Sequence, residues 1–202
     1  KLFDLIVCPE HDNLNFDNCI STLLAIHNIK FKKNIRNKNT INFIIGGPNK
    51  YFKFQQQTQE KILNEIKFLS NNFKVNVIPS RRTPRALIEE LSKIDNENVI
   101  TFNDLFNPKK YGELLSEGNL QVVTWDSISM ISEAISSDAG TFLFKFEEKF
   151  CPKRYNKFFD RIIELNFAQF YNQNLKPYEI SIDDYNKNLK TKILNKIQSN
   201  LR

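Results

Sequence analysis

The chain has 202 residues, of which 41% are hydrophobic and 26% are charged, and its formal net charge is +6. These values are ordinary for a soluble globular protein, and no apolar run approaches the roughly 18 residues that a transmembrane helix needs. The three cysteines (Cys8, Cys19 and Cys151) are odd in number and widely spaced, which argues against a disulfide framework or a zinc site and favours a reducing compartment. The moderate charge allows an anionic ligand or a membrane surface, whereas a nucleic-acid binder usually concentrates its charge more.

The first forty residues predict a strand, an ambiguous segment and a linker. Residues 3–8 are apolar and strand-like, and they end in Pro9-Glu10-His11-Asp12. Residues 16–29 are mostly apolar, and their pattern fits a helix or a strand. Residues 30–40 are basic, rich in asparagine and unpatterned, which is typical of a linker between domains. Because the chain starts in a buried-type strand without an initiator methionine, we expect an N-terminal portion to precede it.

Beyond the linker, apolar strands alternate with amphipathic helices. The strands are expected at residues 41–45, 75–78, 99–102, 120–124 and 142–146. The helices are marked by Ile62, Ile66 and Leu69, by Leu87, Leu91 and Ile94, by residues 111–116, by Ile128, Ile131 and Ile135, by Phe158, Ile162 and Leu165, and by Leu189, Ile193 and Ile197. This alternation predicts an α/β fold with a Rossmann-like parallel sheet and helices on both faces.

Ligands bind beyond the carboxyl ends of the strands in such a sheet, and polar segments follow three of the strands. In Gly46-Gly47-Pro48, two glycines let the backbone turn sharply and bring N–H groups to an anion, although a simple turn explains them equally well. In Ser80-Arg81-Arg82-Thr83-Pro84, Thr83 suits an N-cap and Pro84 the first helical position. The two arginines beside that helix would clamp a phosphate, and the alternative is a solvated basic turn.

The third polar segment is the run from Thr124 to Ala134. Asp126, Ser127 and Ser129 crowd its strand-to-helix turn, where hydroxyls and free N–H groups can hold a phosphate or a diphosphate. Ser129 and Glu133 are four residues apart and therefore share one helix face. A carboxylate one turn below a phosphate site can accept hydrogen bonds from ribose hydroxyls. The alternative is a capped helix with a solvent-facing glutamate.

Candidates for catalysis are few. His11 and Asp12 follow a strand, so the histidine could be a general base that the carboxylate orients; a polar surface turn is the alternative. The other histidine, His27, shows no metal spacing with it. The sequence has no Asp-x-Asp cation motif, Walker loop, Gly-x-Ser-x-Gly elbow or Cys/His cluster. We therefore expect neither a metal nor a bound cofactor.

Taken in order, these segments resemble the elongated-mitochondria family, which includes a plant mitochondrial-fission factor and many bacterial relatives. The matching pieces, which span nearly the whole chain, are Asp4-Leu5-Ile6-Val7 with His11-Asp12, Gly46-Gly47-Pro48, Ser80-Arg81-Arg82-Thr83-Pro84, Asn107-Pro108 with Tyr111, Thr124 to Ala134, and the basic aromatic stretch from Lys153 to Phe159. The chain departs from the family at Glu10, where relatives carry a basic residue. It also departs at Asp138-Ala139-Gly140-Thr141, which replaces a Gly-Lys-Pro-type connection and predicts a change in the nucleotide pocket.

The resemblance implies a glycosyltransferase-B-like fold, in which two Rossmann-like domains face each other across a cleft. Residues 1–39 would be the end of the N-terminal domain with the linker, and residues 40–202 the C-terminal nucleotide-binding domain. The implied protein is cytoplasmic or peripheral at the inner membrane, and it transfers the sugar of a nucleotide-diphosphate-sugar to an unknown envelope or lipid acceptor without metal or nucleic acid. The competing hypothesis is a non-catalytic adaptor that recruits a partner at a membrane surface.

The resemblance also implies roles for single residues. Asp126 to Ser129 would lie by the diphosphate and Glu133 by the ribose, while His11 and Asp12 would face the cleft from the acceptor side as catalytic residues. The nucleotide- and phosphate-binding residues that we expect are Gly46, Gly47, Ser80, Arg81, Arg82, Thr83, Asp126, Ser127, Ser129, Met130 and Glu133.

Overall fold

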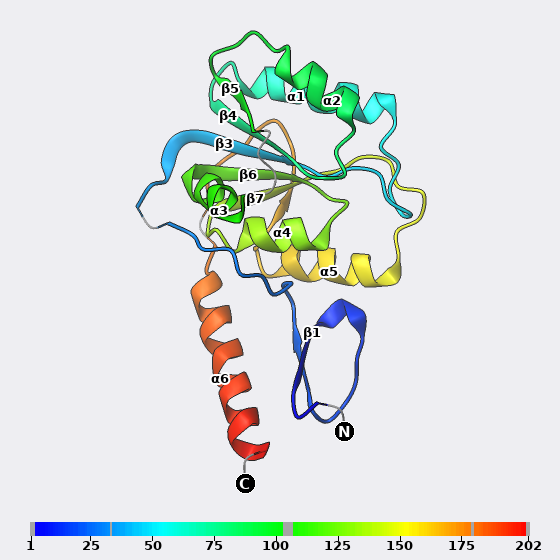
Figure 1. The fold of residues 1–202 in the computed structure, drawn as a ribbon, viewed down its shortest axis with the longest axis vertical. Coiled ribbons are helices and arrows are strands. Elements are labelled where there is room, and N and C mark those ends of the chain that lie inside the picture. Colours follow the sequence, from blue (N-terminus) through cyan, green and yellow to red (C-terminus); the bar gives the residue numbers. More distant parts are fainter. Residues whose placement is uncertain (1–2, 33, 103–106, 179, 201–202) are drawn as a thin grey trace.

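The computed structural model describes residues 3–32, 34–102, 107–178 and 180–200, and its main body is a six-stranded parallel sheet (Figure 1). The strands are β3 (Asn37–Ile45), β4 (Lys74–Pro79), β5 (Val99–Thr101), β6 (Gly118–Thr124), β7 (Gly140–Phe144) and β8 (Gln169–Phe170). Their order is β5-β4-β3-β6-β7-β8, and every pair is parallel. Within this sheet the chain enters at the central strand β3, continues through β4 to the edge strand β5, and returns to β6 on the other side of β3. The strand order therefore reverses between the neighbours β3 and β6, and the crevice at their carboxyl ends is the topological switch point, where open sheets bind ligands.

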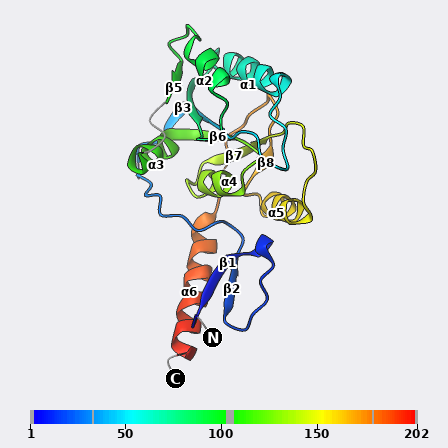
Figure 2. The same cartoon turned by 45° about the vertical axis from the view of Figure 1, so that its right-hand side comes forward.

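Helices cover both faces of this sheet, as Figures 1 and 2 show. On one face lie α1 (Gln56–Leu69) and α2 (Arg85–Ser92); on the other lie α3 (Pro108–Glu117), α4 (Ile128–Ile135) and α5 (Lys153–Glu164). Most of the predicted apolar positions point into the core: Ile62, Ile66, Leu69, Leu87, Leu91, Ile128, Ile131, Ile135, Phe158 and Ile162 are buried. Leu165, which follows the end of α5, and Ile197 near the end of the last helix are exposed, contrary to the prediction. The predicted α/β class, with a Rossmann-like parallel sheet and helices on both faces, is confirmed.

A second, smaller sheet contains the N-terminal residues. β1 (Ile6–Pro9) pairs in parallel with β2 (Cys19–Thr22), and a short 3-10 turn, η1 (Glu10–Asp12), follows β1. The ambiguous residues 16–29 thus contain a strand rather than a helix, followed by a loop without regular structure. A two-stranded sheet is marginal by itself, so its stability depends on neighbouring elements.

The last helix, α6 (Ile182–Asn200), provides such a neighbour. It leaves the main body and runs beside β1 and β2 (Figure 2), and the Leu23 N–H donates a 2.7 Å hydrogen bond to the Tyr185 hydroxyl. The predicted C-terminal domain therefore ends in a helix that lies against the N-terminal sheet. Across the described residues, no helix combines the length and the apolar character needed to cross a bilayer.

The segment that was expected to alter the nucleotide pocket lies at the opposite edge of the sheet. Asp138 precedes β7, at the amino-terminal ends of the strands, and has a left-handed φ of 59°. Its carbonyl oxygen accepts a 3.0 Å hydrogen bond from the Arg36 guanidinium, which precedes β3. Because ligand sites form at the carboxyl ends, this departure from the family pattern does not reach the pocket described below.

Candidate functional site

The turns that follow β3 and β6 meet at the switch point. The Gly46 N–H donates to the Thr124 hydroxyl (2.7 Å), and the Gly47 N–H donates to Oδ2 of Asp126 (3.1 Å). A Cβ at Gly46 would collide with the Asp126 carboxylate, and one at Gly47 with the carbonyl of Arg82. Glycine is thus needed here for close approach of two turns. The anion expected at these N–H groups is, for Gly47, the carboxylate of Asp126, while the Gly46 N–H donates to a neutral hydroxyl.

Replacing Gly47 with alanine is expected to lower the free energy of unfolding by about 1–3 kcal/mol, because the added methyl group overlaps backbone atoms that cannot rotate away. Urea denaturation of the wild type and the variant measures this difference. Gly140→Ala is the matched control: its Cβ would lie 3.1 Å from the Tyr178 ring and 3.2 Å from the Tyr178 carbonyl oxygen, a much milder contact than the backbone overlap at Gly47. Equal losses in the two variants would contradict the close approach at Gly47.

Asp126 and Arg82 form an ion pair beneath this turn. Nη2 of Arg82 lies 2.8 Å from Oδ2 of Asp126, and its Nη1 donates a 2.8 Å hydrogen bond to the Gly47 carbonyl. The Asp126 side chain is fully buried, whereas that of Arg82 is 36% exposed. Burial raises the pKa of Asp126, and the Arg82 charge opposes this effect. The sequence predicts that Asp126 lies by the diphosphate; in the structure its carboxylate pairs with Arg82, which lines the two pockets described below.

Thr83 does not cap α2, so that prediction is wrong. The N-cap is Pro84 and the helix begins at Arg85. The buried Thr83 hydroxyl instead lies 2.8 Å from the Ile45 carbonyl oxygen and 2.7 Å from that of Gly46, and it accepts a hydrogen bond from the Ser80 N–H (2.8 Å). Both carbonyls lie at the carboxyl end of β3 and, although the Ser80 N–H also donates to the Ile45 carbonyl (2.8 Å), they take the hydroxyl that a cap would need.

A pocket of about 820 Å³ lies beyond the ends of β3 and β4, between α3 and α4. It brings together seven of the predicted residues: Ser80, Arg81, Arg82, Ser127, Ser129, Met130 and Glu133. Apolar side chains, including Ile29, Phe102 and Leu114, form much of the remaining wall. The volume and the mixture of apolar wall with few polar groups are typical of small-molecule sites.

The start of α4 supplies hydrogen-bond donors to this pocket. Ser127 is the N-cap, and its hydroxyl accepts a long 3.5 Å hydrogen bond from the Met130 N–H. The first N–H groups of a helix have no intrahelical acceptor, and the helix dipole adds partial positive charge there. Ser129 is exposed on the same turn. This end of α4 can therefore bind an anion that also contacts Arg81 and Arg82.

Glu133 is held by a residue that the sequence did not assign to the site. The Tyr111 hydroxyl of α3 donates a 3.0 Å hydrogen bond to Oε2 of Glu133 on α4, and both residues line the pocket. Burial raises the pKa of Glu133, and the hydrogen bond from Tyr111 lowers it. Tyr111 has a pKa well above its usual value because it is buried beside that carboxylate. The tyrosine thus orients the carboxylate toward the pocket.

Buried amides fix α3, and with it Tyr111, on the sheet. Nδ2 of Asn42 in β3 donates to the Leu114 carbonyl (2.7 Å), and Nε2 of Gln121 in β6 donates to the Leu115 carbonyl (2.9 Å). Asn42 also donates to the Gln121 side chain (3.0 Å). Because all of these groups are buried, the hydrogen bonds leave little freedom for α3 to move away from the pocket.

A smaller pocket of about 420 Å³ adjoins the first, and both are lined by Arg82, Ser127 and Ser129. It lies between η1 of the small sheet and the main body, where His11 and Asp12 face Tyr51, Arg154 and Tyr155. Nε2 of His11 is 3.7 Å from the Asp12 carboxylate, and Nη1 of Arg154 is 3.9 Å from it. Arg154 also donates a hydrogen bond to the Tyr51 hydroxyl (3.2 Å).

The environment of His11 favours a neutral imidazole. Burial lowers the pKa of His11, Asp12 opposes this effect, and the Arg154 charge adds to it. The ring packs edge-on against Phe158 of α5, with 6.2 Å between ring centroids. Burial also lowers the pKa of His27, which packs edge-on against Phe31. A neutral His11 in a pocket can accept a proton at physiological pH.

The two histidines are expected to make stability fall as the solution is acidified below about pH 6.5, their ordinary pKa. Between the lowered folded-state pKa and 6.5, the unfolded state binds more protons, so stability rises with pH in that window and is lost as pH falls through it. Melting temperatures from about pH 7.5 to about pH 5 test this. His11→Gln and His27→Gln should each flatten the curve, and an unchanged slope in the double variant would refute the assignment.

Within the described residues, no cluster of three or more His, Cys, Asp or Glu side chains could hold a metal ion. The chain matches the family model described as "Mitochondrial fission ELM1" over residues 1–193. It is also 28% identical over 146 residues to "Uncharacterized protein RP120" of Rickettsia prowazekii (strain Madrid E). That alignment covers 67% of this chain and 40% of the relative, so the chain spans less than half of the relative's length.

Proposed function

This chain belongs to the mitochondrial fission ELM1 family, and we propose that it is the nucleotide-binding half of a metal-independent, glycosyltransferase-B-like enzyme. A nucleotide-diphosphate-sugar binds in the larger pocket, and its sugar passes to an envelope or lipid acceptor in the smaller one. The observation that supports this most strongly is the junction of the two pockets at the start of α4. Arg82, Ser127 and Ser129 line both pockets, so a diphosphate held there would have a nucleoside on one side and a sugar on the other.

The residues around the junction suit a leaving diphosphate. The first turn of α4 offers N–H groups and two serine hydroxyls, and Arg81 and Arg82 offer positive charge. Such fixed donors stabilise charge that develops on a leaving group, as a metal ion would in other enzymes. Glu133, one turn further along α4, accepts hydrogen bonds from ribose hydroxyls. The base then lies against the apolar part of the pocket wall.

His11 supplies the acceptor side of the reaction. A neutral imidazole takes the proton from an acceptor hydroxyl as its oxygen bonds to the anomeric carbon, and the bond from that carbon to the diphosphate breaks. Asp12, 3.7 Å from Nε2 of His11, stabilises the imidazolium that forms. Arg154 contacts both Asp12 and Tyr51, and it thereby positions the carboxylate.

Calorimetric titration of the full-length protein with uridine and guanosine diphosphate-sugars tests the proposal. We expect saturable binding that is weakened by Ser129→Ala and by Glu133→Ala. Release of nucleoside diphosphate on addition of acceptor extracts then tests turnover. Absence of binding by a folded sample at millimolar ligand would refute the proposal and favour the non-catalytic adaptor. In that case, alanine at Ser129 and Glu133 would leave cellular function intact.

A further inference from the structure

The pairing of β1 with β2 brings two cysteines together. In the register of the small sheet, Cys8 lies opposite Ser21, and Cys19, two residues before Ser21, lies on the same face. The Sγ atoms of Cys8 and Cys19 are 3.0 Å apart. This is only roughly 1 Å more than the disulfide bond length of about 2.05 Å. The two sulfur atoms are therefore already in contact across the strands.

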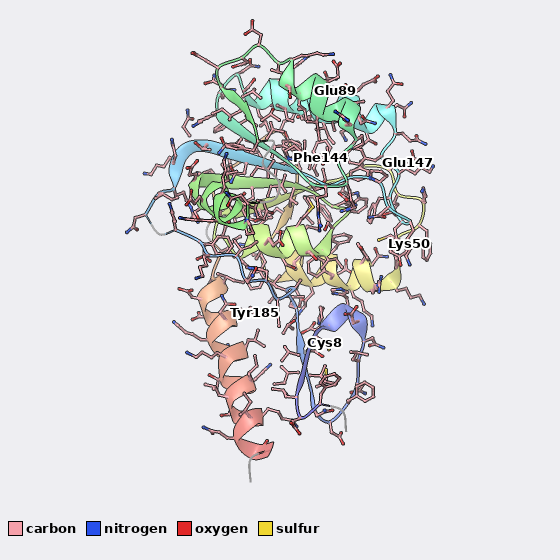
Figure 3. The ribbon with its side chains drawn as sticks, in the orientation of Figure 1. Cys8, Lys50, Glu89, Phe144, Glu147 and Tyr185 are labelled. Carbon is pink, nitrogen blue, oxygen red and sulfur yellow. The ribbon has the colours of Figure 1, made fainter. Side chains whose placement is uncertain are left out.

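The two thiols differ in their access to solvent. Cys8, labelled in Figure 3, is buried in the small sheet at 5% exposure. Its hydrogen bond with Cys19 and its burial raise the pKa of its thiol to about 11. Cys19 is only half-buried, and it lines a pocket of about 590 Å³ between β2 and α6. A reagent from solvent thus meets Cys19 first.

The wall of this pocket suits an anionic reagent. Lys192 and Lys196, four residues apart on one face of α6, line it together with Cys19, while Glu10 is the acidic residue on its rim. Two ammonium groups on the wall of this pocket attract a carboxylate-bearing molecule toward the sulfur. The pocket therefore gives solvent molecules access to Sγ of Cys19, and its two lysines favour the entry of anions.

We propose that Cys8 and Cys19 form a thiol–disulfide exchange site whose substrate is an anionic low-molecular-weight disulfide of the glutathione type. The Cys19 thiolate attacks one sulfur of that disulfide; a mixed disulfide forms on Cys19 and one glutathione thiolate leaves. Cys8 then gives up its proton to the leaving thiolate and attacks Sγ of Cys19, which releases the second glutathione. Two protein thiols are oxidised to one disulfide, and one disulfide is reduced to two thiols.

The resulting crosslink would close the loop that contains η1. Cys8 and Cys19 are 11 residues apart, and His11 and Asp12 lie between them. The oxidised form therefore holds the turn that faces the smaller pocket in a covalent ring. In the sequence, the spacing of the cysteines argued against a disulfide framework. In the structure, Cys8 and Cys19 are close because β1 and β2 lie side by side.

Thiol counting on the full chain tests the site. The reduced protein, equilibrated with graded ratios of oxidised to reduced glutathione, is alkylated and analysed by mass spectrometry. We expect free thiols to fall from three to one, with a loss of about 2 Da for the two hydrogens removed. Peptide mapping should join the Cys8 and Cys19 peptides. In the Cys8→Ser variant the reaction should stop at a glutathione adduct on Cys19, and in the Cys19→Ser variant neither the adduct nor the crosslink should form. Alanine at Lys192 and Lys196 should slow the exchange several-fold.

Cys151→Ser is the matched control, because it removes the remaining thiol, which precedes α5 in the main body, and should leave the crosslink unchanged. Three free thiols under oxidising ratios, a crosslink to Cys151, or glutathione attached to Cys8 would each overturn the proposal. The map of the wild-type protein decides the matter even if a serine variant folds poorly. The result is independent of whether a nucleotide binds in the larger pocket.

Discussion

Replacing Asp126 with asparagine should lower the free energy of unfolding by about 2–3 kcal/mol and weaken nucleotide binding by roughly tenfold or more. The variant keeps the size of the side chain but removes the charge that pairs with Arg82 at 2.8 Å. Breaking a fully buried ion pair costs about 3–5 kcal/mol; the expected loss is smaller because Arg82 is 36% exposed and water screens its charge. Binding falls because Arg82 is no longer held at the junction of the two pockets.

Chemical denaturation measures the first effect and calorimetric titration the second. Asp138→Asn is the matched control, since this exposed aspartate lies at the amino-terminal ends of the strands. Asparagine also tolerates the left-handed φ of 59° at that position. If Asp126→Asn were no less stable than the control, the buried pair would not be the anchor of the turn.

Glu133→Gln should weaken binding of a nucleoside diphosphate by on the order of tenfold, since hydrogen bonds to a charged acceptor contribute about 1.5–3 kcal/mol each. The loss should be much smaller for a 2′,3′-dideoxy nucleotide, which lacks the hydroxyls that donate to this carboxylate. Tyr111→Phe should reproduce part of the loss, because the 3.0 Å hydrogen bond that orients Glu133 disappears. Calorimetric titration with both nucleotides measures this selectivity.

The raised pKa of Glu133 adds a pH signature to this prediction. Protonation removes the charged acceptor, so the wild-type affinity should decrease as pH falls through that raised pKa, and the Glu133→Gln curve should be flat there. Glu89→Gln is the control: Glu89 lies on α2, on the opposite face of the sheet (Figure 3), and is 63% exposed. Equal selectivity for the two nucleotides in wild type and Glu133→Gln would exclude a ribose contact.

Local patterns were sufficient for the sheet from β3 to β7 and its helices because these elements show their own periodicity; β2 was left open between helix and strand, and the two-residue β8 was not predicted. The apolar spacing of Ile62, Ile66 and Leu69 predicted α1, and that of Ile128, Ile131 and Ile135 predicted α4. The segments after β4 and β6 were predicted to meet because the carboxyl ends of parallel strands share one edge of the sheet, and residues of both segments line the larger pocket. These inferences need only neighbouring residues and one rule of topology.

Pairwise contacts were beyond the reach of such patterns. Tyr111 and Glu133 are 22 residues apart on different helices, and nothing local indicates that one hydroxyl reaches the other's carboxylate. Asp126 was interpreted as a residue that faces the ligand, because a sequence does not reveal whether a polar side chain at a turn points outward or back into the protein. Thr83 failed for the same reason, since its competing acceptors come from β3.

The helix that covers the small sheet has a consequence for the order of folding. The hydrogen bond from Leu23 to Tyr185 joins residues 162 positions apart, so β1 and β2 are synthesised long before the helix that completes their packing. The strands of the main body are all made in between. During synthesis the body is therefore expected to fold first, and β1 and β2 complete their packing only when α6 closes onto β2. A chain that ends before Tyr185 would keep the residues that line both pockets at the start of α4 and lose the helix that packs against β2.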